Sequence, residues 1–422
     1  MIHLKSLRTG YLGLARLLSA LALLTCVARA DTILVDAANG PGTDYTDLPQ
    51  AVQAASHGDL ILMRAGDYSS VTTAKGLRIL GLESGVAISG PFVLQNLHSS
   101  RKFVMTRVEL TEVEFRNCAG HVALSHVEAY YRLRAVTVED CADVRLSDLF
   151  VVGREGQGQA VLINKSDVEL VDCTIRGWTG PHGDWDYVGA SGETGVLIGD
   201  ASRVRISLCE IDGGTGTDVW TEFWLSSPGN GMPAVHVRGG SEVWITGDGT
   251  QTLQGGHCGW AGQFADTPGD GSVALFVEQA STVRRSGVIC QGGWGPFTWE
   301  PEQVAVTGGT IEEPVVPDPT LEMIGDPIPG QVLTMRVTGP PGGNVRYLLG
   351  RIPELSYLGG VGPDLLVEIR LVNPGLIPAS GVRDYDFVLP GNLPQGMYFL
   401  GQAKIVYDGS TYRTPSQVIL AH

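Results

Sequence analysis

One short pattern recurs four times in the middle of the chain, and it limits the fold more than any other feature. In each copy, a strand-like run of four residues is followed, after two or three more, by Ser-x-Val. The copies begin at Ala160, Gly195, Ala234 and Ala274. Paired strand-like segments that recur with a fixed turn predict a solenoid, whose function lies on its surface rather than in a globular pocket.

The interval between repeats changes along the chain. Val113-Glu114-Phe115 is followed 23 residues later by Val136-Thr137-Val138, and about 23 residues suffice for one turn of three short strands. Beyond Gly153 the interval grows to 35, 39 and 40 residues. The excess forms three inserts, residues 178–194, 213–233 and 254–273. Because the inserts interrupt equivalent positions, we expect them to leave the solenoid from the same side.

The first 30 residues have the form of a signal peptide. Basic residues precede an apolar run from Leu17 to Val27, and Ala28-Arg29-Ala30 has the small-x-small form of a cleavage site. The run is short for a membrane span, which needs about 20 apolar residues. We therefore expect a mature chain that starts near Asp31, has no membrane span, and is secreted to the extracellular space or cell surface, with the periplasm as an alternative.

The charge of the chain limits its partners. Loss of the four basic residues in the leader would take the formal charge from −16 to −20. Nucleic-acid binding needs clustered cations, so this balance argues against a nucleic-acid partner. The 57 glycines and the scarcity of helix-periodic stretches indicate an all-β protein, and the length allows two domains.

Four of the six cysteines beyond the leader fall at matching places in successive repeats. Cys118 matches Cys141, and Cys173 matches Cys209. This placement predicts ladders of small buried side chains. The remaining two, Cys258 and Cys290, are the one candidate disulfide pair. Arg284-Arg285 interrupts the last apolar repeat and is expected to face solvent at the end of the solenoid.

A short amphipathic helix is predicted near the start of the mature chain. Asp47 is placed to cap it, Pro49 suits its first turn, and Leu48, Val52 and Ala55 share one face. We expect this helix to cover the N-terminal end of the solenoid, which would otherwise expose strand edges.

The segment after this helix carries a family resemblance. It holds Gly58-Asp59 before an apolar run, then Ala65-Gly66-Asp67-Tyr68, then Gly76-Leu77. With these features the chain resembles the pectin-lyase-like superfamily over residues 32 to 310. The resemblance implies a right-handed parallel β-helix over residues 31–313. It leaves the activity open, because esterases, lyases and epimerases share this opening.

The repeats stop at a Pro-rich linker, residues 314–320. In the segment that follows, residues 321–422, short runs of alternating polarity are separated by Pro and Gly turns, as in Val332 to Val337. This pattern predicts a small antiparallel β-sandwich, similar to modules appended to secreted bacterial β-helix proteins.

The three inserts combine tryptophans with acidic residues and contain no Lys or Arg. Aromatic faces pack on the C–H groups of sugars while carboxylates accept hydroxyl protons, so we predict binding of a polysaccharide or cell-surface glycan. The candidate ligand-binding residues are Trp178, Asp184, Trp185, Asp186, Glu193, Asp218, Trp220, Glu222, Trp224 and Trp260.

Two alternatives remain for these inserts. The tryptophans are also suited to building a small core beneath long loops. The acids Asp184, Asp186 and Glu193 are candidate calcium ligands, because Ca²⁺ prefers carboxylate and carbonyl oxygens, but a solvated acidic loop has the same composition.

The sequence assigns no catalytic residue. The short aspartate motifs of hydrolases with this fold are missing, as is the Arg-x-Pro-x-x-Arg of the lyases, and Gly255-Gly256-His257-Cys258-Gly259 has no companion acids at matching repeats. Glycan binding is the predicted function. The alternatives are a lyase or glycoside hydrolase with a non-standard site, and a non-catalytic spacer or adhesion protein at the cell surface.

Overall fold

The computed structural model describes most of the chain, and the expected signal peptide at residues 1–30 lies outside the described part. No helix among the described residues has the length and apolar character needed to cross a membrane. The described ranges are residues 31–127, 136–153, 158–179, 189–218, 228–247, 249–259, 269–295, 303–313, 319–326, 328–350, 368–389, 398–407, 410–413 and 417–420.

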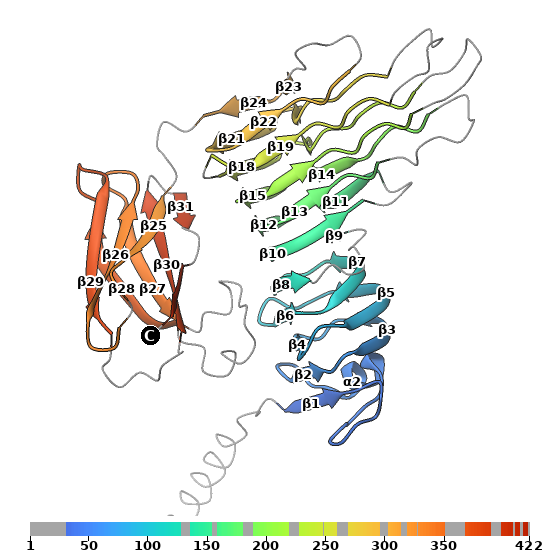
Figure 1. Cartoon of the computed structure of the whole chain (residues 1–422), viewed down its shortest axis with the longest axis vertical. Coiled ribbons are helices and arrows are strands. Elements are labelled where there is room, and N and C mark those ends of the chain that lie inside the picture. The colour runs from blue at the N-terminus through green and yellow to red at the C-terminus, as the bar shows by residue number, and fades with distance from the viewer. Residues whose placement is uncertain are drawn as a thin grey trace, which may run out of the picture.

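Long parallel sheets run through residues 32–312 (Figure 1). One sheet contains, in spatial order, β1 (Thr32–Val35), β2 (Leu60–Met63), β4 (Arg78–Gly81), β6 (Lys102–Thr106), β8 (His121–Val127), β10 (Asp143–Val152), β12 (Asp167–Val171), β15 (Arg203–Ser207), β18 (Glu242–Thr246), β21 (Thr282–Ser286) and β24 (Thr310–Glu312). The other contains β3 (Gly66–Thr73), β5 (Val86–Gln95), β7 (Glu109–Arg116), β9 (Val136–Glu139), β11 (Gln159–Asn164), β14 (Thr194–Gly199), β17 (Val235–Val237), β20 (Leu275–Glu278) and β23 (Val304–Thr307).

A third row of short strands continues from the second half of β10. It contains β13 (Thr174–Arg176), β16 (Glu210–Asp212), β19 (Thr252–Gln254) and β22 (Ile289–Gln291). Three rows of parallel strands around one apolar core are consistent with a parallel β-helix, and we call residues 32–312 the solenoid.

The pairing of the strands confirms the repeat intervals. Val113 lies opposite Val136 in the parallel pair β7 and β9, which is the 23-residue interval. The four copies of the sequence pattern also align, since Val161 pairs with Val196, Val196 with Val235, and Val235 with Leu275. The inserts therefore begin and end at equivalent turns.

A ladder of small polar side chains follows the second sheet at one turn. The N–H of Cys141 donates to Ser166 Oγ at 3.0 Å, and Ser166 N–H donates to Ser202 Oγ at 3.3 Å. The ladder continues from Ser202 to Ser241 and from Ser241 to Ser281 at 3.2 and 3.3 Å. These serines are buried, so each hydroxyl satisfies a main-chain N–H that would otherwise lack a partner.

The cysteines stack as predicted. Cys118 and Cys141 follow the paired strands β7 and β9, and Cys173 N–H donates to Cys209 Sγ at 3.4 Å. Burial raises the pKa of the Cys209 thiol, which keeps it protonated and unreactive. All six described cysteines are free, so the candidate pair Cys258 and Cys290 is not bonded.

The expectation for Arg284-Arg285 holds only for the first residue. Arg284 faces outward beside the Trp244 ring, whereas Arg285 lies opposite the buried Ile245 in a core position of the ladder. The Arg285 guanidinium reaches Cys290 Sγ at 3.1 Å and Glu313 at 2.9 Å. Near the end of the solenoid, an inward side chain can still find a carboxylate partner.

The predicted helix is α2 (Leu48–Ala54), and Asp47 caps it. Asp47 accepts from the N–H of Leu48 at 2.8 Å, and the buried helix residues Leu48, Ala51 and Val52 join the core of the solenoid. At its other end, Lys75 Nζ donates to three main-chain carbonyls at residues 52, 53 and 55.

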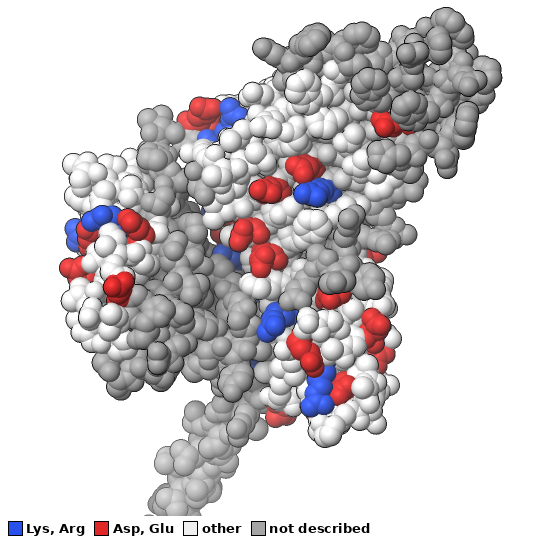
Figure 2. Space-filling view, in the orientation of Figure 1, with Lys and Arg blue, Asp and Glu red and all other residues white. Residues whose placement is uncertain are grey.

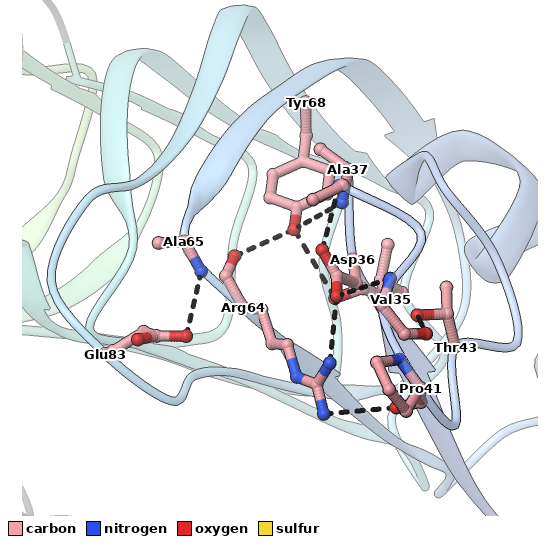
Figure 3. Close-up of polar contacts among 11 residues, drawn as sticks. Val35, Asp36, Ala37, Pro41, Thr43, Arg64, Ala65, Tyr68 and Glu83 are labelled. Carbon is pink, nitrogen blue, oxygen red and sulfur yellow. Dashed lines mark hydrogen bonds and ion pairs between the residues drawn. The ribbon is translucent and has the colours of Figure 1, made fainter.

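A group of polar contacts joins residues of the first turns of the solenoid (Figure 3). Arg64 Nη1 lies 2.9 Å from Asp36 Oδ2, and the buried Tyr68 hydroxyl donates to the Arg64 carbonyl at 2.8 Å. The same hydroxyl accepts from the Ala37 N–H at 3.3 Å, so Tyr68, which belongs to the Ala-Gly-x-Tyr turn, ties the first two turns together.

Antiparallel strands follow the solenoid. One sheet contains β25 (Thr320–Ile324), β26 (Val332–Thr338) and β29 (Val382–Val388). Another contains β28 (Glu368–Leu376), β27 (Asn344–Gly350), β30 (Tyr398–Tyr407), β31 (Ser410–Arg413) and β32 (Gln417–Leu420). Their buried residues, among them Met335 and Ile405, form a core separate from that of the solenoid.

Candidate functional site

The described parts of the three inserts, together with residues 292–295 after β22, form a layered array that projects from one side of the solenoid (Figure 1). We call each described segment a stem: chain leaves the solenoid along outgoing stems and re-enters it along returning stems. The outgoing stems are residues 177–179, 213–218, 255–259 and 292–295, and the returning stems are residues 189–194, 228–233 and 269–273. The common side of exit agrees with the prediction.

Main-chain hydrogen bonds join the stems with a period of three residues. In the second outgoing stem, the N–H groups of Gly213 and Gly216 donate to the next outgoing segment, at the carbonyls of Gln254 (2.8 Å) and His257 (2.9 Å). The N–H groups of the following residues, Gly214 and Thr217, donate instead to a returning stem, at the carbonyls of Glu193 (2.8 Å) and Ala190 (2.9 Å). A three-residue period is that of a polyproline II-like chain.

Glycine is required in the stems because the main chains approach so closely. A Cβ atom on Gly214 would lie 1.9 Å from the Trp178 carbonyl oxygen, and one on Gly256 would lie 2.0 Å from that of Gly214. Neither residue has a positive φ. The requirement is therefore steric, and we call the array the glycine lattice.

Side chains leave the lattice at every third residue, in two rows that cross the stems. The base row continues the pairing of β13, β16, β19 and β22, and the outer row lies three residues further along each stem. The base row is Arg176, Asp212, Gln254 and Gln291, and the outer row is Thr179, Thr215, His257 and Trp294. All eight are at least partly exposed, and Trp294 is 62% exposed.

Polar contacts fix several of these side chains. Arg176 Nε lies 3.3 Å from Asp212 Oδ2. Burial raises the pKa of Asp212, and the nearby Arg176 only partly opposes this shift. Gln254 Nε2 donates to the Gly292 carbonyl at 3.0 Å, which leaves its Oε1 as an acceptor.

The His257 ring is also held in place. Its Nδ1 accepts from the Trp294 N–H at 2.8 Å, and the His257 carbonyl accepts from Gly216 at 2.9 Å. Because Nδ1 is an acceptor in this bond, the neutral ring carries its proton on Nε2. The ring therefore presents a donor beside the exposed Trp294.

Three of the residues predicted from sequence lie in the described stems. Trp178 and Asp218 are half-buried, and Glu193 is buried at 6% exposure with its Oε2 atom lacking a hydrogen-bond partner among the described residues. The others fall outside the described part of the chain: Asp184, Trp185, Asp186, Trp220, Glu222, Trp224 and Trp260.

The calcium prediction concerns Glu193 together with two aspartates outside the described residues. Within the described ranges, no group of three or more His, Cys, Asp or Glu side chains is close enough to hold a metal ion. The alternative of a tryptophan core depends mainly on tryptophans outside the described residues and stays a prediction; among the described ones, Trp178 is half-buried and Trp294 is exposed. Main-chain hydrogen bonds join the described stems.

A hollow of about 450 Å³ lies at the last turn of the solenoid. Its lining includes Arg285, Cys290, Gln303 and Glu313. Burial raises the pKa of Cys290, although Arg285 opposes the shift. Figure 2 shows the charged side chains of the solenoid face in small, scattered groups. Near the last turn, Arg284 Nε lies 2.8 Å from Glu312 Oε2.

Sequence reasoning missed the lattice and with it most of the two rows. The sequence signal that could have revealed the lattice is a pair of glycines at the same place in three successive repeats: Gly213-Gly214, Gly255-Gly256 and Gly292-Gly293. His257 and Trp294 each stand directly after such a pair.

Comparison with known proteins adds no assignment. No protein-family model matches the chain, and no curated protein shows significant similarity to it.

Proposed function

We propose that this protein is an exported, pectin-lyase-like right-handed β-helix that binds an extracellular polysaccharide through the glycine lattice, which its inserts and residues 292–295 form. In this proposal α2 caps the N-terminal end, and the antiparallel strands after the linker form a sandwich. The observation that carries the proposal is the exposed Trp294 ring on the glycine lattice, with hydrogen-bonding side chains beside it.

The lattice supports binding rather than core formation. Main-chain atoms fill much of its interior, since a Cβ atom on Gly214 would lie only 1.9 Å from the Trp178 carbonyl oxygen. No residue of the described stems belongs to the hydrophobic core of the solenoid, so Trp294 has no such core to complete there. An aromatic ring that stays exposed beside polar groups is typical of a sugar-binding surface.

A glycan array tests the proposal. The chain from Asp31 is applied to neutral and acidic glycans, first with calcium and then with a chelator. We expect a specific signal from at least one class of polysaccharide, reduced by Trp294→Ala. Calcium-dependent binding to acidic glycans would indicate an ion held by Asp184, Asp186 and Glu193, and would justify a search for lyase products.

Trp244→Ala is the matched control. Trp244 lies on β18 of the solenoid, where Arg205 and Arg284 lie 5.6 and 5.5 Å from its ring, and it is not part of the lattice. Absence of any glycan signal under both conditions would overturn the proposal in favour of a spacer or adhesion protein.

A further inference from the structure

We infer that the base and outer rows of the glycine lattice together bind one linear, neutral polysaccharide, whose long axis crosses the stems. This inference rests on the proposed function and names the ligand class and its direction. It uses the eight described row residues and no part of the insert tips.

The direction of the ligand follows from the geometry of the rows. Neighbouring stems that pair like strands lie about 4.8 Å apart, so four stems span roughly 14 Å. Residues three apart along a stem are separated by about 9 Å. The result is a strip about 14 Å long and 9 Å wide, and one sugar ring is similar in length to one stem spacing.

The charge of the strip favours a neutral ligand. Its only full charges are Arg176 and Asp212, which form an ion pair at 3.3 Å. The other members carry amides, hydroxyls, an imidazole and an indole. The opposite charges of this pair cancel, so the rows offer no spare cation to a chain of uronic acids.

Each member of the outer row offers a contact that sugars use. The Trp294 ring can pack on the C–H face of one sugar, and the Nε2–H of His257 can donate to a hydroxyl of the next. Thr215 and Thr179 continue the row with groups that donate and accept. Sugar hydroxyls need both kinds of partner.

The lattice also lowers the entropic cost of binding. The stems are tied to neighbours in two directions by main-chain hydrogen bonds of 2.7–3.1 Å. The row residues therefore stand on a backbone that needs little further ordering. A preorganised surface of this kind loses less conformational entropy when a ligand binds.

Titration calorimetry with neutral β-1,4-linked gluco-oligosaccharides of two to six sugars tests the inference, using the chain from Asp31. These extended chains suit a flat, straight strip. We expect affinity to rise with length up to about four sugars and then level off, because the strip crosses four stems. Oligogalacturonates of equal length should bind more weakly.

Variants locate the site. Trp294→Ala should lower the affinity about tenfold or more, as expected for an aromatic anchor. His257→Ala should lower it less, and Trp244→Ala should leave it unchanged. Since Trp294 is 62% exposed, its replacement should keep the fold, which circular dichroism checks.

The outcomes separate this inference from the proposed function. Glycan binding that is unaffected by Trp294→Ala and His257→Ala would overturn the strip while leaving a glycan-binding protein. Affinity independent of chain length, or stronger for oligogalacturonates, would also overturn it. Absence of binding to any glycan on the array would remove the proposed function itself.

Discussion

The Asp36 carboxylate shows how much one side chain contributes at the first turn of the solenoid. It accepts from the N–H groups of Ala38 and Gly40 at 2.9 and 3.0 Å, and from Arg64 Nη1 at 2.9 Å. The bond from Arg64 is the main reason that the pKa of Asp36 lies below its usual value. The ionised form is therefore favoured in the folded protein.

Replacing this carboxylate should lower stability in a pH-dependent way. A lowered folded pKa stabilises the protein above the unfolded pKa, near 3.9, and this contribution disappears as pH falls through the folded pKa. We expect Asp36→Asn to lower Tm at pH 7 and the difference from the original protein to shrink below about pH 4. Thermal melts from pH 2.5 to 7 measure this, with the exposed Asp67→Asn as control. A difference that is constant with pH would contradict it.

The buried serine ladder gives a second prediction at this scale. Ser202 Oγ donates to the Gly199 carbonyl at 2.6 Å and accepts from Ser166 N–H at 3.3 Å. Ser202→Ala should cost roughly 1–3 kcal/mol, because a buried N–H loses its partner. Ser202→Cys should cost less, since Cys118 and Cys141 hold the same position earlier in the ladder. Urea unfolding compares the stabilities of the two variants. Equal losses would show that an acceptor atom at this position does not contribute to stability.

At the scale of the elements, the stems require glycine for a steric reason and not for the usual one, which is a positive φ. Gly214 has no unusual φ, but the main chain of Trp178 occupies the place where its Cβ would lie. The requirement is set by neighbouring stems. It therefore belongs to the assembled lattice and not to the local turn.

Gly214→Ala should accordingly destabilise the lattice. Overpacking typically costs about 1–3 kcal/mol, and a clash with main chain leaves little freedom to relax. Thr215→Ala, the next residue, is the control, because position 215 already carries a Cβ that faces outward. Hydrogen exchange should show faster exchange in the stems for Gly214→Ala only. Unchanged protection would show that the stems can separate at little cost.

The same elements show which parts of the structure could be predicted. The strands were predictable because alternating Val, Ile and Leu residues report which side faces the core, as in Val161-Leu162-Ile163. The lattice was not, because its hydrogen bonds join main chains and leave no apolar pattern. Arg285 was misjudged in part because periodicity identifies a core position but not the charged partners near the last turn, Glu313 among them.

At the level of the whole molecule, the solenoid and the antiparallel strands have separate hydrophobic cores. Val35 and Cys290 are the first and last buried residues of the solenoid core, which ends before the Pro-rich linker. Each part therefore has the buried residues that independent folding requires.

A chain of residues 31–313 should fold without the C-terminal segment. We expect it to keep its β-sheet circular dichroism, to unfold cooperatively, and to retain any glycan affinity of the full chain, because the lattice lies within it. Analytical ultracentrifugation and calorimetry check these points. Aggregation of the shortened chain, or loss of glycan affinity, would show that the C-terminal strands are needed.

The large share of main-chain atoms inside the glycine lattice has a thermal consequence. Unfolding raises heat capacity in proportion to the apolar surface exposed, while exposure of peptide groups lowers it. The solenoid, with its ladders of Val, Ile and Leu, should unfold with a large positive heat-capacity change. The lattice buries mainly peptide groups and should contribute little or with opposite sign. Cooling weakens the stabilisation that comes from hydrophobic burial. The glycine lattice should therefore lose less stability in the cold than the solenoid does.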